Sequence, residues 1–150
     1  MSEFEDIRML TAGPKLISAL VFRIVSDLAV MANFVVTNDA EEEAYLRTYF
    51  GEAAGEYRLA RFHLMRQVVQ MFYAMAFLLS GSSGKTIEPN APPPAFRDFH
   101  NRIWAGEVRF AADEAKLQYG RVHLNQLLQN MRTGRFHDAL RLVSDRHASA

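Results

Sequence analysis

The chain has 150 residues, 49% of them hydrophobic and 23% charged, and is therefore long and apolar enough to fold as a single domain over residues 1–150. Lys plus Arg and Asp plus Glu both number 17, so no basic surplus attracts nucleic acid or an anionic membrane, while the zero net charge favours a homo-oligomer. The absence of cysteine excludes disulfide bonds, thiolate metal sites and a thiol nucleophile.

The N-terminal part predicts a helix that is buried in protein. The first six residues, MSEFED, are acidic where a secretory signal is basic, so we expect a cytoplasmic protein. The apolar stretch over residues 16–36 is about long enough to span a bilayer, but Arg23 and Asp27 near its centre cost roughly 2.5–3.5 kcal/mol each in lipid. Because these two residues are spaced i,i+4, they can pair on one face of a helix that ends near Phe34.

The acidic run that follows predicts a second helix. The N-cap candidates are Thr37, Asn38 and Asp39, and a glutamate stands three residues beyond each of the last two, as in a capping box. The negative charges over residues 39–43 suit a helix N-terminus, whose dipole favours acidic side chains, and we prefer this interpretation to a metal site. The helix should end near Phe50, with Gly51 as its C-cap.

The longest helix is predicted over residues 54–80. Polar residues alternate with apolar ones in its first half, whereas residues 71–79 are apolar all round. A helix segment without a polar face is surrounded by protein, so this run should be the centre of the core. The glycines, serines and prolines of residues 81–94 predict a flexible surface loop.

The rest of the chain also predicts helices. Three are expected, separated by Gly106 and Gly134, at about residues 94–105, 111–133 and 134–148. No stretch alternates with a period of two, and no two hydrophobic runs are joined by a hairpin turn. The sequence therefore predicts an all-α fold, a compact bundle of about six helices.

Two patterns that suggest chemistry have simpler explanations. Gly84, Lys85 and Thr86 match the end of a phosphate-binding loop, but Leu79 stands where that motif needs its first glycine. The histidines lack the i,i+3 or i,i+4 spacing of metal ligands, so we expect no metal site and place them at the surface or at helix ends. They are His63, His100, His123, His137 and His147.

The aromatic residues leave two interpretations open. Phe72, Tyr73 and Phe77 lie in the apolar half of the longest helix, and further aromatic residues, including Tyr119, are distributed over the later helices. They either pack as ordinary core or form one wall of a pocket that holds a cationic ligand against ring faces.

From residue 26 onward the chain contains, in order, SDLAVMANF, EEEAYLRTYFG, RLARFHLMRQVVQMFYAMAFLL, FHNRIWAGEV and YGRVHLNQLLQNMRTGRFHDALRLV. This order resembles the C-terminal half of the large lobe of bacterial choline/ethanolamine kinase-like phosphotransferases, in the aminoglycoside phosphotransferase superfamily with its protein-kinase-like fold. The resemblance covers about residues 26–150. It implies a structural role for Asp27, with which Arg23 can pair at i,i+4 spacing. It also implies that a small cation such as choline or ethanolamine is held by an aromatic wall of Tyr73, Phe77 and Tyr119.

The resemblance also implies what this chain lacks. Such kinases hold ATP and magnesium with a nucleotide-lobe lysine, a catalytic-loop aspartate and asparagine, and a metal-binding aspartate, all of which should precede Asp27. Residues 1–25 contain no such set and do not resemble the family. Two functions are therefore predicted as alternatives. One is a truncated kinase-like substrate-binding subdomain, inactive alone and without catalytic residues or a cofactor site. The other is a non-enzymatic helical interaction or assembly module.

Overall fold

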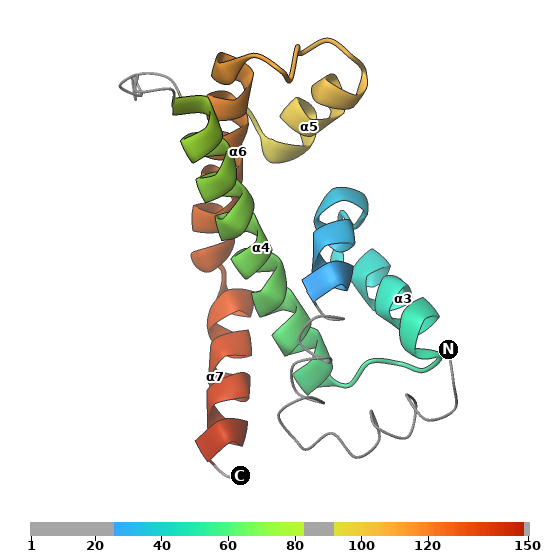
Figure 1. Ribbon diagram of the computed structural model, residues 1–150. Helices are drawn as coiled ribbons and strands as arrows, with labels where there is room; N and C mark the ends of the chain where they lie inside the picture. The colour runs from blue at the N-terminus through green and yellow to red at the C-terminus, as the bar shows by residue number, and fades with distance from the viewer. Residues whose placement is uncertain (1–25, 83–91, 149–150) are drawn as a thin grey trace, which may run out of the picture.

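The computed structural model describes residues 26–82 and 92–148, and this part of the chain is helical (Figure 1). The all-α prediction is confirmed. Arg23 and most of the predicted first helix lie outside the described residues, which begin with a helix over residues 26–35. The helices that follow are α3 (Asp39–Phe50), α4 (Glu56–Ser82), α5 (Phe96–Trp104), α6 (Asp113–Met131) and α7 (Gly134–Ala148).

Helix α3 begins and ends where its capping residues predict. The side chain of Asn38 accepts a hydrogen bond from the backbone N–H of Glu41 at 2.9 Å, which satisfies one of the unpaired donors of the first turn. Gly51 follows the last turn with a φ of 73°, a left-handed conformation that favours glycine, and its N–H donates to the carbonyl of Arg47. The prediction for this helix is confirmed at both ends.

Helix α4 pairs antiparallel with α6 along its C-terminal part, and α7 lies along the rest of α4, as Figure 1 shows in green, orange and red. Two glycines allow this close approach. A Cβ atom on Gly120 of α6 would lie 2.8 Å from the backbone nitrogen of Leu78, and one on Gly81 of α4 would lie 2.7 Å from the carbonyl oxygen of Asp113. The predicted loop over residues 81–94 is therefore wrong at its start, because Gly81 and Ser82 form the last turn of α4. Residues 83–91 lie outside the described part.

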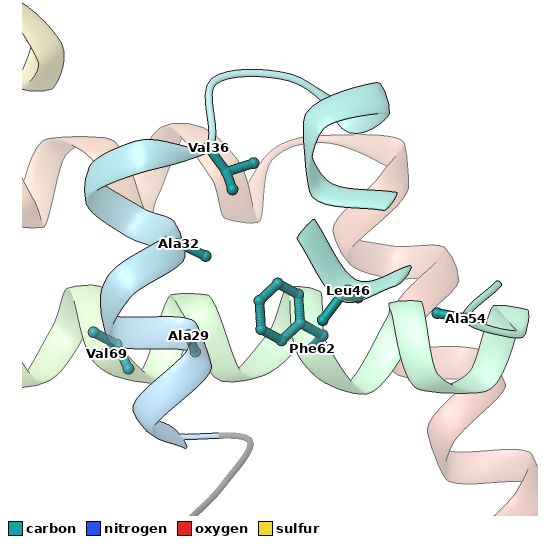
Figure 2. Close-up of a cluster of buried hydrophobic side chains, with 7 residues drawn as sticks. All are labelled: Ala29, Ala32, Val36, Leu46, Ala54, Phe62 and Val69. Carbon is teal, nitrogen blue, oxygen red and sulfur yellow. The ribbon is translucent and has the colours of Figure 1, made fainter. Parts of the chain in front are cut away.

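The core lies on one side of α4. Its larger cluster joins the helix over residues 26–35 to α3 and α4, with Phe62 of α4 at its centre (Figure 2). Ala29 and Ala32 are fully buried there, and their small side chains leave room for the helix over residues 26–35 to pack closely against α4. A second cluster joins α5 and α6 through Phe96, Phe99, Tyr119 and Val122.

The prediction that residues 71–79 form the centre of the core is wrong. Met71 is 45% exposed, Phe72 60%, Met75 51% and Leu79 76%. Neighbouring helices cover only part of the circumference of α4, and its remaining face is apolar but has no partner among the described residues. No helix in the described ranges is long and apolar enough to cross a bilayer.

Candidate functional site

The three aromatic residues predicted to bind a substrate lie together. The ring centroids of Tyr73 and Phe77 are 5.7 Å apart, and those of Phe77 and Tyr119 are 4.9 Å apart. His123 contacts all three rings, with its centroid 4.4 Å from that of Tyr119. The structure thus brings these residues together around an imidazole that sequence reasoning had placed at the surface.

Buried hydrogen bonds hold this cluster in place. His123 is fully buried and its Nδ1 donates to Oε1 of Gln70 at 2.6 Å, while the hydroxyl of Tyr119 and Nδ1 of His100 are 2.7 Å apart. Burial and the neighbouring charge of His100 lower the pKa of His123 to about 3. Burial raises the pKa of Tyr119, because it disfavours the phenolate. His123 and Tyr119 are therefore neutral at pH 7.

The surface prediction for the histidines is wrong for three of the five. His63, His100 and His123 are buried, at 7%, 8% and 0% exposure, whereas His137 is exposed. The side chain of His147 lies outside the described part. The spacing signal could not distinguish these cases, because burial of a lone histidine depends on helices that are distant in sequence.

The other predicted site residues lie apart from this cluster. Asp27 is exposed near the start of the helix over residues 26–35, and Arg23 lies outside the described residues. The rings of Tyr73, Phe77 and Tyr119 pack against one another, and neither of the two pockets described here is lined by them. Their geometry is that of an aromatic core.

A buried ionic network is the feature that sequence reasoning missed. Glu42 of α3 is only 1% exposed, and it accepts from Nη1 of Arg66 at 2.5 Å and from Arg135 of α7. Arg66 also donates from Nε to Oδ1 of Asn33 at 2.9 Å, and Arg135 also pairs with Asp39. The acidic run was assigned to the helix dipole, and Asp39, Glu41 and Glu42 do lie in the first turn of α3, but this assignment did not predict the buried ion pairs of Glu42. The signal was periodicity, because Glu42 and Leu46 are four residues apart and are the two buried positions of α3.

Next to this network lies a cavity of about 350 Å³, which we call the polar pocket. Its lining includes Arg66, Arg97, Arg135 and His63. Arg97 of α5 donates to the backbone carbonyl of Val36 at 3.0 Å and to that of Phe34, at the C-terminal end of the helix over residues 26–35. The pocket therefore collects guanidinium groups from three different helices.

Along the α4–α6 pair, an exposed apolar face lies opposite the core. Tyr73 and Phe77 of α4 face the core together with Tyr119 and His123 of α6. The exposed apolar residues of each helix recur at i,i+3 and i,i+4 spacing and therefore share one side of that helix. We call this surface the α4–α6 apolar face. Its side chains, each 39% to 76% exposed, are Val68, Met71, Phe72, Met75, Leu79, Leu124, Leu128 and Met131.

Within the described residues, no group of three or more histidine and carboxylate side chains is arranged to hold a metal ion. Comparison of the chain with models of known protein families, with curated proteins and with solved structures finds no match in any of the three.

Proposed function

We propose that this chain is a non-enzymatic helical assembly module that self-associates through the α4–α6 apolar face. The observation that supports this function is the number of exposed apolar side chains that recur at helical spacing on α4 and α6, two helices packed against each other. Large apolar patches on soluble proteins mark interaction sites, because their exposure to water is unfavourable.

The area of this face suits a protein partner. Its eight side chains, each about half exposed, offer on the order of 700 Å² in total, which exceeds the roughly 300–600 Å² of the largest patch on a typical monomer. It approaches the roughly 800 Å² per partner that a standard protein–protein interface buries.

A second copy of the chain is the occupant that we infer. Two antiparallel helices that present an apolar face can meet their own copy across a two-fold axis, where the same surface serves both subunits. The product is a four-helix arrangement in which the apolar side chains of all four helices are buried. The formal net charge of zero adds no long-range repulsion between the copies.

The test is a matched pair of double substitutions in the full chain. Val68→Glu with Met75→Glu places two charges on the α4–α6 apolar face and should convert the dimer to a monomer. Met31→Glu with Val35→Glu makes the same changes at equally exposed positions on the helix over residues 26–35 and should leave the dimer intact. Sedimentation equilibrium over a range of concentrations measures the dimer dissociation constant of each protein.

Two results would contradict self-association through this face. One is a parent chain that is monomeric at all concentrations, and the other is equal weakening of the dimer by the two double substitutions. In the monomeric case, slow peroxide oxidation of Met71 and Met75 would indicate that another part of the same chain covers the face.

A second candidate function follows from the contact among Tyr73, Phe77 and Tyr119. We infer from the kinase-like resemblance that these rings descend from a wall for a small cation, which ring faces attract. Supporting this candidate, the side chains named from the resemblance adjoin one another. Against it, Ala76 stands where a further aromatic residue is expected, and the rings are packed together.

If a cation wall remains, millimolar choline or ethanolamine should raise the melting temperature of the parent and of Tyr73→Phe alike, since the ring face is kept. Tyr73→Ala should abolish this shift and lower the free energy of unfolding by roughly 3–5 kcal/mol, as expected for a packed aromatic residue. Sodium chloride at equal ionic strength is the control. A large stability loss in Tyr73→Ala, without any choline-dependent shift in the parent, would leave core packing as the role of these residues.

A further inference from the structure

Three of the eight side chains of the α4–α6 apolar face are methionines, those of Met71, Met75 and Met131. They are 45%, 51% and 40% exposed. The other side chains of the face belong to valine, phenylalanine and leucine, so methionine is the residue type on it that a mild oxidant converts to a polar group. The chain has no cysteine, so no thiol of its own competes with these thioethers for the oxidant. The polarity of the face can therefore be changed by oxidation.

Met75 has apolar neighbours on its own helix. One turn away along α4, at i,i+3 and i,i+4 spacing, stand Met71, Phe72 and Leu79. All three are exposed, Phe72 by 60% and Leu79 by 76%. None of these side chains carries a hydrogen-bond donor. A polar oxygen on the sulfur of Met75 would be solvated by water while the face is exposed, but it would find no donor among these neighbours once a second copy covers the face.

We propose that Met71 and Met75 are oxidation sites through which a peroxide reversibly controls the self-association of the chain. This inference rests on the proposed function, because it needs the face to be buried between two copies. The oxidant is hydrogen peroxide. A lone pair of the thioether Sδ attacks one peroxide oxygen and forms the S–O bond while the O–O bond breaks. Methionine is thereby oxidised to the sulfoxide, and the peroxide is reduced to water.

The sulfoxide should favour the monomer. Its oxygen accepts hydrogen bonds from water, and burying it against apolar side chains without a donor is unfavourable. The modification is reversible, because methionine sulfoxide reductases return the thioether with electrons from a dithiol. The dithiol becomes a disulfide, and the sulfoxide oxygen leaves as water. Peroxide therefore shifts the equilibrium toward single chains, and reduction shifts it back.

The reverse coupling follows from the same equilibrium. Since sulfoxides weaken the dimer, dimerisation should protect the two thioethers, because the interface excludes water and peroxide. Met31 provides an internal reference, since it is 55% exposed on the helix over residues 26–35 and lies outside the face. We expect Met75 and Met31 to be oxidised at similar rates in dilute monomer, whereas Met75 should react several-fold more slowly in the dimer. Peptide mass spectrometry of a peroxide time course gives the rate at each methionine.

Sedimentation equilibrium of the full chain before and after peroxide treatment tests the proposal. The treatment is continued until peptide mass spectrometry shows sulfoxide at Met71 and Met75. We expect the dimer dissociation constant to rise at least about tenfold, because each chain then buries two polar oxygens in the interface. Incubation with sulfoxide reductases and dithiothreitol should restore the original dissociation constant. Circular dichroism of the oxidised chain controls for unfolding.

Two variants separate these sites from the other methionines. Met71→Leu with Met75→Leu preserves apolar volume, so it should dimerise as the parent does and keep its dissociation constant after the same treatment. Met31→Leu makes the same change outside the face and should respond to peroxide like the parent. The double variant still contains Met65 and Met131, so it also reports any effect of oxidising those residues.

Three results would overturn control by oxidation. A parent dimer that is unaffected by sulfoxide at both positions would do so while leaving self-association intact. Equal weakening of the parent and of the double variant would place the effect at other methionines. A parent chain that is monomeric at all concentrations would contradict self-association and this inference together.

Discussion

Replacing Glu42 with alanine should lower the free energy of unfolding by about 3–5 kcal/mol, because it leaves two buried or half-buried guanidinium groups without their shared carboxylate. Glu42 is 1% exposed, and Arg66, the more buried of its two arginine partners, is 18% exposed. An intact buried ion pair contributes only modestly to the free energy of unfolding. Removing one partner is much more costly, because the remaining charge is then buried without a counter-ion and is poorly solvated. Urea denaturation at pH 7 measures the change.

The adjacent residue provides the matched control. Glu43 is also an ion-paired glutamate of α3, with its Oε1 3.0 Å from Nη2 of Arg47, but both side chains are about half exposed. Glu43→Ala should therefore cost less than about 1 kcal/mol, as exposed pairs generally do. Similar losses in Glu42→Ala and Glu43→Ala would mean that the network around Glu42 is solvated and would contradict its description as buried.

Stability should fall steeply as the pH is lowered from 7 to 5. In the folded chain, burial first, and then the charges of Arg135 and Arg66, lower the pKa of His63 to about 4, and burial and His100 lower that of His123 to about 3. In the unfolded chain, both pKa values return to about 6.5. Between these values the unfolded chain binds protons that the folded chain does not. The contribution of the two neutral histidines to the free energy of unfolding is therefore fully present above about pH 6.5 and declines below it.

The expected loss is about 2 kcal/mol for each of these two histidines between pH 7 and pH 5, or about 4 kcal/mol together. Urea denaturation at pH 7, 6 and 5 measures it. His63→Gln should remove about half of the pH dependence, because glutamine does not titrate, whereas His137→Gln at an exposed position should leave it unchanged. A free energy of unfolding that stays constant from pH 7 to pH 5 would show that neither imidazole is held neutral by burial.

The elements that sequence reasoning located well depend on neighbours close in the chain. Asn38 and Gly51 bound α3 because their capping hydrogen bonds reach residues only three or four positions away. The long helix α4 follows in the same way from an uninterrupted run of helix-forming residues, although its end was placed at Ser80 rather than Ser82. The contact between Tyr73 and Phe77 is local, because the two residues are four positions apart on α4, whereas their contact with Tyr119 needed the antiparallel pairing of α4 with α6.

The errors concern burial, which depends on contacts between helices that are far apart in the sequence. Residues 71–79 are apolar all round, and whether such a run is enclosed depends on how many helices surround it. Here the chain covers one side of α4, and the other side became the α4–α6 apolar face. In the same way, the sequence spacing of the histidines did not indicate which of them are buried. The burial of His63, His100 and His123 followed from the packing of α4, α5 and α6.

The sequence by itself determined the helical class, the caps of α3 and the approximate extent of the helices, because hydrogen bonds within a few residues specify these features. Only the tertiary structure decided which charges are buried and which apolar residues face outward. Glu42 meets Arg66 across 24 positions and Arg135 across 93 positions of the chain, and the polar pocket exists because these segments converge. Such contacts depend on how whole helices pack against one another, and local periodicity indicates which face of a helix is buried but not which distant residue that face meets.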